Sequence, residues 1–238
     1  MNDNAVSAAA PAPAASFPAL GRHGVSTPDD NLHVRRIQPG ESLGDVQRLR
    51  REVYFHEQGQ HQREHSSRIA DGLDGSGTVI VVERGDQAVG TLRMHDFSAP
   101  AVQVEYGSLF QIDRFASAWP LQRVVVGSRF AVQSDQRVQA VLDRLIQETY
   151  RHALEKDIRF GLVACEPSLY SLFEYYGFRE YLPPAVLADG TALLRMLLVT
   201  EDEPHLRHCD SPLQHMVRNP AAGRAARTWL ERSFSQAF

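Results

Sequence analysis

Lysine is nearly absent from this 238-residue chain: Lys156 is the single lysine among 25 Lys and Arg residues. The codon usage of a GC-rich genome explains such a bias, although arginine also pairs with carboxylates and phosphates through two parallel hydrogen bonds. An excess of positive charge is absent too, because the formal net charge is −4. The composition therefore argues against a broadly basic nucleic-acid-binding protein.

Cysteine is scarce, since the chain holds two, Cys165 and Cys209. Two cysteines are too few for a disulfide framework and fit a reducing compartment. Long apolar runs are also missing, so we expect no transmembrane segment. The N-terminal residues lack a basic segment, and prolines interrupt their apolar stretch, which argues against a signal peptide. We expect a cytoplasmic protein.

The composition that remains is globular, with 43% hydrophobic and 23% charged residues. At roughly 100–200 residues per domain, the length allows one domain with extensions. Residues 1–30 are rich in Ala, Pro and Ser without a period, so we predict a disordered arm there. We expect a folded domain at 31–202 and a C-terminal extension at 203–238 that carries a basic helix.

Hydrophobic periodicity divides the domain into short strands and helices. Alternating or β-branched runs predict strands at 32–37, 78–82, 88–94, 101–106, 123–132, 160–165, 178–182 and 192–200. Three- and four-residue steps predict helices at 41–57, from Ser134 onward with that serine as the cap, at 167–176 and at 220–238. A polar loop, 58–77, lies between the first helix and the hairpin. Gly127 inside a strand indicates a bulge or a close backbone approach.

The order of these elements predicts a mixed α/β sheet. The first half contains an antiparallel hairpin, whereas strand, long helix and strand in the second half demand a parallel pair with a crossover. This order and the string LFEYYGF at residues 172–178 resemble the GNAT acyltransferase fold and its L-Y-x-x-x-G-F signature. The resemblance implies an antiparallel N-terminal half and a parallel, splayed central pair, flanked by helices.

Short motifs resemble more closely the N-acyl amino acid synthases and the acyl-homoserine lactone (autoinducer) synthases. The motifs are Arg-x-x-x-aromatic in the first helix, D-x-x-D in the loop, G-x-x-R in the hairpin and S-R-F-x-V in the central strand. They correspond here to Arg50 and Tyr54, Asp71 and Asp74, Gly90 and Arg93, and Ser128, Arg129, Phe130 and Val132. The matches lie in order along the predicted elements of the expected domain.

The resemblance implies an acyltransferase that moves an acyl group from a thioester donor to the amine of a small, amino-acid-like acceptor. GNAT enzymes carry a glycine-rich loop before the long helix, where backbone amides meet the pyrophosphate of coenzyme A. The stretch here, Asp135–Ala140, has no glycine. The phosphopantetheine arm of an acyl carrier protein has only one phosphodiester, so we expect that donor. The expected donor-binding residues are Val132, Gln133, Arg137, Val138 and Gln139.

The expected catalytic residues are Arg129, Ser128, Glu105 and Tyr170, and the expected acceptor-binding residues are Arg50, Tyr54, Asp71, Asp74, Arg93 and Phe130. The two strand arginines orient an acceptor carboxylate or hold Asp71 and Asp74 of the loop by bidentate pairing, or they form ordinary structural ion pairs at a sheet edge. Glu105 is a candidate base or a solvated strand carboxylate. The tyrosine that often protonates the leaving thiolate in this superfamily is replaced by Phe173, and Tyr170, Tyr175 or Tyr176 could substitute. We expect no metal and no permanently bound cofactor.

Three alternatives stay open. The first is an autoinducer synthase that uses S-adenosylmethionine, although such enzymes carry Trp and Glu where this chain has Gln60 and Val126. The second is an acyl-CoA-dependent GNAT N-acetyltransferase. The third is a catalytically silent binding module that retains the fold. Clustered arginines at 48–51 and 218–232 could steer an acidic carrier protein toward the enzyme.

Overall fold

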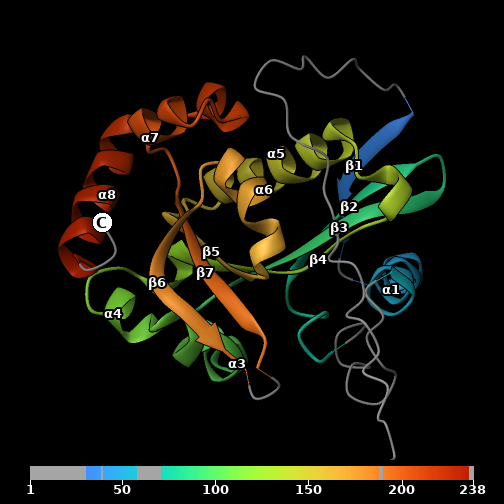
Figure 1. Ribbon diagram of the computed structural model, residues 1–238, viewed down its shortest axis with the longest axis horizontal. Helices are drawn as coiled ribbons and strands as arrows, with labels where there is room; N and C mark the ends of the chain where they lie inside the picture. The colour runs from blue at the N-terminus through green and yellow to red at the C-terminus, as the bar shows by residue number, and fades with distance from the viewer. Residues whose placement is uncertain (1–30, 39, 58–70, 188–189, 236–238) are drawn as a thin grey trace, which may run out of the picture.

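A single mixed sheet organises the computed structural model, which describes residues 31–38, 40–57, 71–187 and 190–235 (Figure 1). Its strand order is β1-β2-β3-β4-β5-β7-β6. The strands are β1 (Leu32–Arg36), β2 (Thr78–Arg84), β3 (Gln87–Asp96), β4 (Val124–Val132), β5 (Phe160–Cys165), β6 (Arg179–Val186) and β7 (Ala192–Val199). Of the described strand pairs, β4 and β5 alone run parallel, so the predicted mixed fold class is confirmed.

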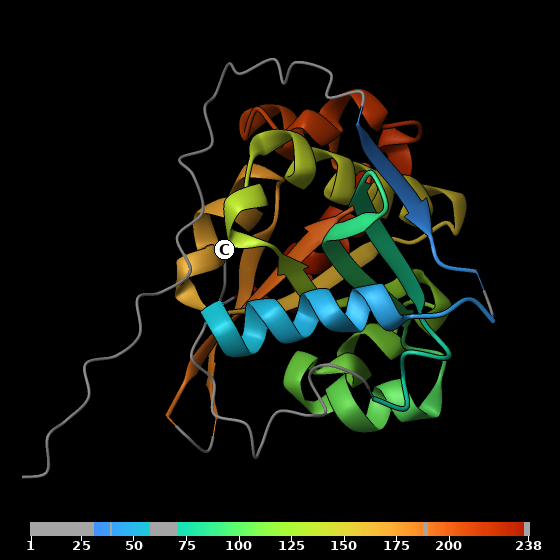
Figure 2. The ribbon, with the colours of Figure 1, turned by 90° about the vertical axis from the view of Figure 1, so that its right-hand side faces the viewer.

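Helices cover both faces of this sheet (Figures 1 and 2). Alternation along β2 separates the faces: Ile80 and Val82 pack with α5 (Gln139–Glu155), whereas Val79 and Val81 pack with α1 (Gly44–Arg51). The short helix α6 (Tyr170–Tyr175) packs on the α5 side. The other side is completed by α3 (Pro100–Phe110), α4 (Ile112–Ala116) and α8 (Pro220–Ser233).

The parallel strands β4 and β5 separate part of the way along their length. They pair from Val124 opposite Phe160 to Gly127 opposite Val163, while β4 continues to Val132. A Cβ on Gly127 would lie 3.2 Å from Val163 Cγ1, so glycine permits the close approach at the apex of the opening. The sheet is therefore split at its centre, as the GNAT resemblance implied.

A β-bulge follows directly on this split. The β3–β4 register changes from Thr91 opposite Ala131 to Arg93 opposite Ser128, which sets two β4 residues against Leu92 alone. Arg129, one of those two residues, has a φ of 55°, in the left-handed region that side chains disfavour. The neighbouring structure must hold this conformation, because an arginine does not adopt it spontaneously.

Some predicted elements were wrong. Residues 101–106 form part of α3 and not a strand. Ser134 begins a 3₁₀ turn, Ser134–Gln136, and does not cap α5, whose N-cap is Val138. The helix predicted at 41–57 is α1 followed by a π-helical turn, η1 (Glu52–Glu57). The predicted arm, Gln60 and residues 58–70 of the predicted loop lie outside the described residues.

The C-terminal residues are attached to the end of β7. After α7 (Glu203–His208) and a 3₁₀ turn (Pro212–Met216), the chain returns, and the backbone N–H of Asn219 donates to the Glu201 carboxylate at 2.6 Å. Gly223 of α8 packs directly on the Glu201 main chain, where a Cβ would collide at 1.9 Å. Across the described residues, we find no helix that is long and apolar enough to cross a membrane.

Candidate active site

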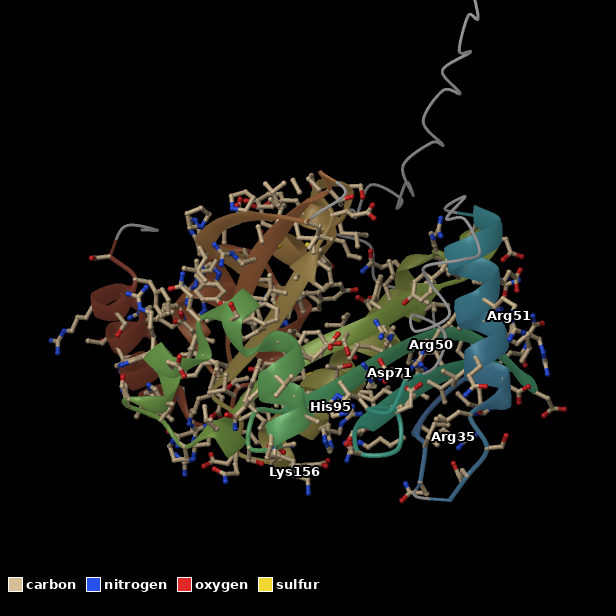
Figure 3. All side chains as sticks on the ribbon, turned by 90° about the horizontal axis from the view of Figure 1, so that it is seen from below. Arg35, Arg50, Arg51, Asp71, His95 and Lys156 are labelled. Carbon is tan, nitrogen blue, oxygen red and sulfur yellow. The ribbon has the colours of Figure 1, made fainter. Side chains whose placement is uncertain are left out.

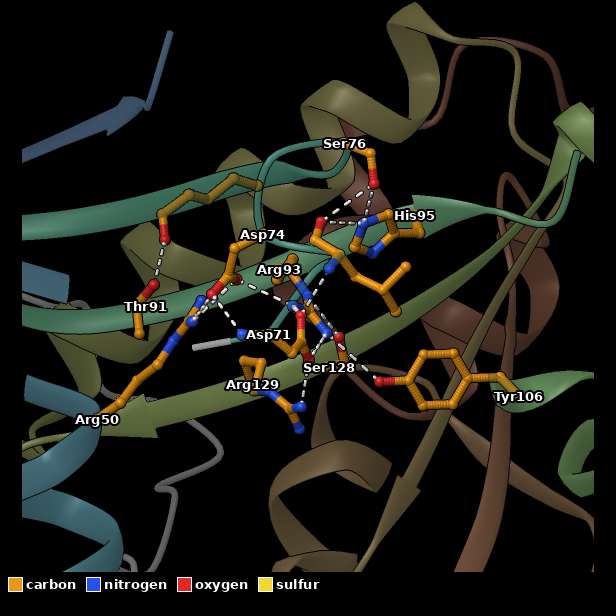
Figure 4. Close-up of polar contacts among 12 residues, drawn as sticks. Arg50, Asp71, Asp74, Ser76, Thr91, Arg93, His95, Tyr106, Ser128 and Arg129 are labelled. Atoms are coloured by element: carbon orange, nitrogen blue, oxygen red, sulfur yellow. Dashed lines mark hydrogen bonds and ion pairs between the residues drawn. The ribbon is translucent and has the colours of Figure 1, made fainter. Parts of the chain in front are cut away.

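Five charged side chains meet where β3, β4 and α1 face one another (Figure 4); we call this group, Arg50, Arg93, Arg129, Asp71 and Asp74, the ionic cluster. Asp74 lies 2.9 Å from Nη1 of Arg50 and 2.9 Å from Nη1 of Arg93. Asp71 lies 2.5 Å from Nη1 and 3.1 Å from Nη2 of Arg93, and it also pairs with Arg129. The structure thus joins residues of four motifs that lie far apart in the sequence.

Each member of the ionic cluster is positioned by its own element. Arg50 lies on the side of α1 that faces Asp71, whereas the next residue, Arg51, points outward (Figure 3). The side chains of Arg50 and Arg93 are 0% exposed, so each must have charged partners. The partners come from the turn that precedes β2, in which Asp71 and Asp74 are three residues apart and turn toward the arginines.

The electrostatics of the ionic cluster keep Asp71 charged. Burial alone would raise the pKa of Asp71, but the hydrogen bond and charge of Arg93 and the charge of Arg129 outweigh burial and lower the pKa to about 2. Among the described residues, the cluster brings three guanidinium groups to two carboxylates. Asp71 is therefore poorly suited to accept a proton, whereas guanidinium groups suit an anionic ligand.

Hydrogen bonds connect the ionic cluster to the bulge. Arg93 Nε donates to Ser128 Oγ at 3.2 Å, and Arg93 Nη2 donates to Tyr106 Oη at 3.4 Å. Tyr54, one helical turn after Arg50, donates its hydroxyl to the Phe130 carbonyl at 3.1 Å. Sequence reasoning missed Tyr106, because its segment was predicted as a strand.

His95 holds the turn that carries the two aspartates. Its side chain is buried, and its Nε2 lies 2.8 Å from the Leu73 carbonyl and 3.4 Å from Ser76 Oγ. Burial and the nearby Arg93 charge lower the pKa of His95, which favours the neutral ring. A neutral ring with Nε2–H donates to Leu73 and so fixes the turn. The one local signal for this residue was its place two positions after Arg93 on the same face of β3.

A cleft of about 280 Å³ opens where β4 leaves β5. Its β4 wall runs from Val126 to Val132 and includes Ser128, Arg129 and Phe130. The opposite wall comes from Val163 to Glu166 of β5 and its end, and Tyr54 and Tyr106 complete it from other elements. Most of the lining is apolar, and Arg129 brings the ionic cluster to its edge.

A second, smaller cavity of about 40 Å³ adjoins this cleft under α5. Its lining is almost wholly apolar, and it shares the side chains of Leu92, Val163 and Phe173 and the Gly127 backbone with the cleft. Phe173 is 2% exposed and stacks at a tilt on Phe130, with ring centroids 5.9 Å apart. Phe173 therefore forms part of the wall between the two spaces.

The remaining expected site residues divide into two groups. Val132 and Arg137 line the cleft. The other five do not line the cleft. The side chains of Gln133, Gln139 and Tyr170 donate hydrogen bonds to Glu52, Asp143 and Glu174, respectively. Val138 and Glu105 are exposed to solvent. Glu105 lies on the outer side of α3, because the segment is helical and its neighbours Val102 and Tyr106 face inward.

In the part of the chain that the structure describes, no group of three or more His, Cys, Asp and Glu side chains could hold a metal ion. Cys165 lines the cleft, but its thiol is buried against the Met196 sulfur, and burial raises its pKa to about 12. A thiol of that kind is a poor nucleophile. The chemistry of the site must therefore be built from arginines, hydroxyls, a carboxylate and the open edge of β4.

Comparison with known proteins agrees with this geometry. No relative was found among proteins of curated function. Among solved structures, FeeM, an N-acyl amino acid synthase from uncultured soil microbes, superposes with a TM-score of 0.58 at 14% identity, over 79% of this chain and 98% of FeeM. The AHL synthase LasI gives 0.51 at 16% identity, over 72% of this chain and 92% of LasI. A putative N-acetyltransferase from Lactobacillus plantarum gives a TM-score of 0.53 at 15% identity, over 71% of this chain and 98% of that protein.

These likenesses show a common fold. The family model of the N-acyl amino acid synthase FeeM matches residues 45–190, which is more than half of the chain. The matched stretch spans α1, the ionic cluster, the bulge and the cleft. This chain therefore belongs to the FeeM family of N-acyl amino acid synthases and is an N-acyltransferase of the type that FeeM and the AHL synthases represent.

Proposed function

We propose that the enzyme transfers an acyl group from the thioester of an acyl carrier protein to the amine of an amino-acid-like acceptor. The observation that carries the proposal is the cleft between β4 and β5, which combines a largely apolar lining with Arg129 of the ionic cluster. An apolar channel suits an acyl chain and the arm that delivers it, and a cationic edge suits an acceptor that carries a carboxylate.

The acceptor is proposed to bind at the ionic cluster. Arg129 lines the cleft at 16% side-chain exposure, while the buried Arg50 and Arg93 add charge behind it. Arg129 presents a guanidinium group at the edge of the cleft, and guanidinium groups pair well with carboxylates. Bidentate pairing to the carboxylate of an amino acid would place its amine in the cleft, near the thioester carbonyl.

The donor is proposed to be an acyl carrier protein rather than coenzyme A. The connection from β4 to α5 contains the Ser134–Gln136 turn and no glycine, so its backbone is less free to wrap a pyrophosphate. Arg137 lines the cleft and donates from Nε to the Val132 carbonyl at 3.2 Å. A single arginine at this edge matches the single phosphodiester of a carrier-protein arm.

Transfer itself requires little from the protein. The amine lone pair attacks the thioester carbonyl carbon, a C–N bond forms, and the C–S bond breaks. The open edge of β4 lines the cleft, where backbone N–H groups can stabilise the developing oxyanion. A thiol with an ordinary pKa of about 8.5 leaves as thiolate without a strong acid, so Phe173 in place of a tyrosine is tolerable.

The test is a reconstituted reaction. Purified enzyme is incubated with acyl carrier protein loaded with one acyl group, or with the matching acyl-CoA, and with S-adenosylmethionine or each of the twenty amino acids as acceptor. Free thiol and N-acyl product are measured by thiol titration and mass spectrometry. We expect N-acyl amino acid from the carrier-bound donor at the higher kcat/KM. A lactone from S-adenosylmethionine, a preference for acyl-CoA, or no thiol release with any acceptor would contradict the proposal.

A further inference from the structure

Amide formation leaves one proton to be removed from the attacking nitrogen. The carboxylates of the ionic cluster are poorly suited to take it. Asp74 is 6% exposed and is held by Arg50 and Arg93, and Asp71 is held by Arg93 and Arg129. Four ion pairs stabilise their charged forms, so each gives up favourable contacts if it accepts a proton.

Glu166 is the one carboxylate among the described residues that line the cleft. It follows Cys165, the last residue of β5, and is half-buried. Its main chain is held, because the Glu166 carbonyl accepts from Leu169 N–H at 2.9 Å. Its side-chain carboxylate makes no hydrogen bond or ion pair with any described residue.

The sheet geometry directs Glu166 toward the face that carries the ionic cluster. Glu166 keeps an extended backbone, with φ −65° and ψ 151°, so it continues the alternation of β5 and shares a face with Ala164. Ala164 packs on the side of Val126, which is also the side of Ser128. Glu166, directly after β5, and Phe130 on β4 each lie three residues beyond the last paired residues, Val163 and Gly127. Glu166 thus stands on one arm of the opening, and the bulge stands on the other.

We propose that Glu166 is the catalytic residue that accepts the proton of the attacking amine; this inference rests on the proposed function. As the nitrogen forms its bond to the thioester carbon, its N–H proton passes to the Glu166 carboxylate. Collapse of the tetrahedral intermediate breaks the C–S bond. The sulfur leaves as thiolate and then takes the proton from Glu166, which gives the free thiol of the carrier arm. Glu166 ends the cycle ionised, and no other reactant is needed.

Other polar groups of the cleft are less suited to this role. The Tyr106 hydroxyl is engaged by Arg93, the Cys165 thiol is buried against Met196, and Arg129 carries a permanent positive charge. Glu105, the carboxylate that the sequence suggested, is exposed on α3 and does not line the cleft. It therefore provides a matched control with the same chemistry outside the site.

The experiment compares Glu166→Gln, Glu166→Asp and Glu105→Gln in the carrier-protein assay. We expect Glu166→Gln to lower kcat about 100-fold or more, with an unchanged KM for the acylated carrier protein. The deficit should shrink as pH rises from about 7 to 9, because hydroxide can then accept the amine proton in place of the missing carboxylate. Glu166→Asp should recover part of the rate, and Glu105→Gln should match the wild type.

The outcomes separate this inference from the proposed function. If the wild type forms no N-acyl product with any acceptor, the proposed function fails. If the wild type forms product and Glu166→Gln keeps its kcat, the role of Glu166 is refuted. A rise in the acceptor KM with kcat unchanged would also refute it, since that pattern means binding without proton transfer. Circular dichroism and thermal unfolding verify that the variants are folded.

Discussion

Asp74 bridges two fully buried arginines, with Oδ2 2.9 Å from Nη1 of Arg50 and Oδ1 2.9 Å from Nη1 of Arg93. This carboxylate links α1 to β3 and supports the remainder of the ionic cluster. The positions of Arg129 and the bulge therefore depend on residues that do not line the cleft. Stability and catalysis should be coupled through this cluster, and several predictions test the coupling.

Replacing Asp74 with Asn should destabilise the fold strongly. The variant leaves two buried guanidinium groups without their shared charge, a change that costs about 3–5 kcal/mol in comparable buried pairs. Asp45→Asn is the matched control, because Asp45 pairs with Arg48 in solvent at 60% and 72% exposure, and such pairs contribute about 0.2–1 kcal/mol. Urea unfolding measures the free energy of unfolding of both variants. Equal free energies of unfolding for the two variants would show that the ionic cluster does not hold the fold.

Acid should weaken the protein partly through Asp71. The pKa of Asp71 is about 2 in the fold and 3.8 ordinarily, so the unfolded chain binds its proton more readily. The stabilisation from Asp71 is fully present above about pH 4 and is lost as pH falls through 2. Thermal unfolding between pH 5 and 2 should therefore show a shallower pH dependence for Asp71→Asn than for the wild type. If the unfolding temperatures of Asp71→Asn and the wild type fall in parallel as pH is lowered, Asp71 does not contribute to the acid dependence of stability.

Arg129 can be separated into backbone and side-chain contributions. Arg129→Gly should be more stable than Arg129→Ala by about 1 kcal/mol, since glycine accepts the positive φ without strain. Both variants should lose about 10- to 100-fold in kcat/KM for an amino-acid acceptor, as expected for a lost charge-assisted contact. Calorimetry and steady-state kinetics give the two quantities. Wild-type activity in a folded Arg129→Gly enzyme would show that Arg129 forms only a structural ion pair and does not bind the acceptor.

Phe173→Ala should extend the range of acyl chains that the enzyme accepts. Removing the ring joins the cleft to the inner apolar cavity, at a stability cost of about 3–5 kcal/mol. Donors of increasing chain length, competed in one reaction and read by mass spectrometry, should show a shift of the optimum toward longer chains. Phe115→Ala is the control, because Phe115 is equally buried but lines neither space. An unchanged optimum in Phe173→Ala, or the same shift in Phe115→Ala, would argue against the divided cleft.

Salt should raise the apparent KM for an acyl carrier protein if exposed arginines steer it. The two arginine clusters in the sequence lie apart in the fold, since α1 and α8 stand at opposite ends of the molecule (Figure 1). Only α1 adjoins η1, whose Val53 and Tyr54 line the cleft. Arg51→Glu should therefore raise KM at low salt, and Arg224→Glu on α8 should not. A KM that is the same at low and high salt would exclude electrostatic steering.

Local patterns in the sequence were sufficient for most of the strands, the longer helices and the parallel central pair, and the family resemblance supplied the residues of the ionic cluster. Alternation and helical spacing report burial on one face, and the motif residues were identified by resemblance. The same reasoning misassigned residues 101–106, because Val102, Val104 and Tyr106 alternate as in a strand. In the fold, Pro100 starts a helix that buries Val102 and Phe110 and leaves Val104 88% exposed.

What local patterns could not supply was the approach of distant chain segments. The split between β4 and β5 depends on where two strands stop pairing, and the left-handed Arg129 runs against the preference of its own residue type. In the sequence, Glu166 is an ordinary carboxylate that follows a strand, and the tertiary structure places it at the wall of the cleft. Electrostatic and packing interactions between residues many positions apart set all three features, so they are properties of the folded chain and of no single segment.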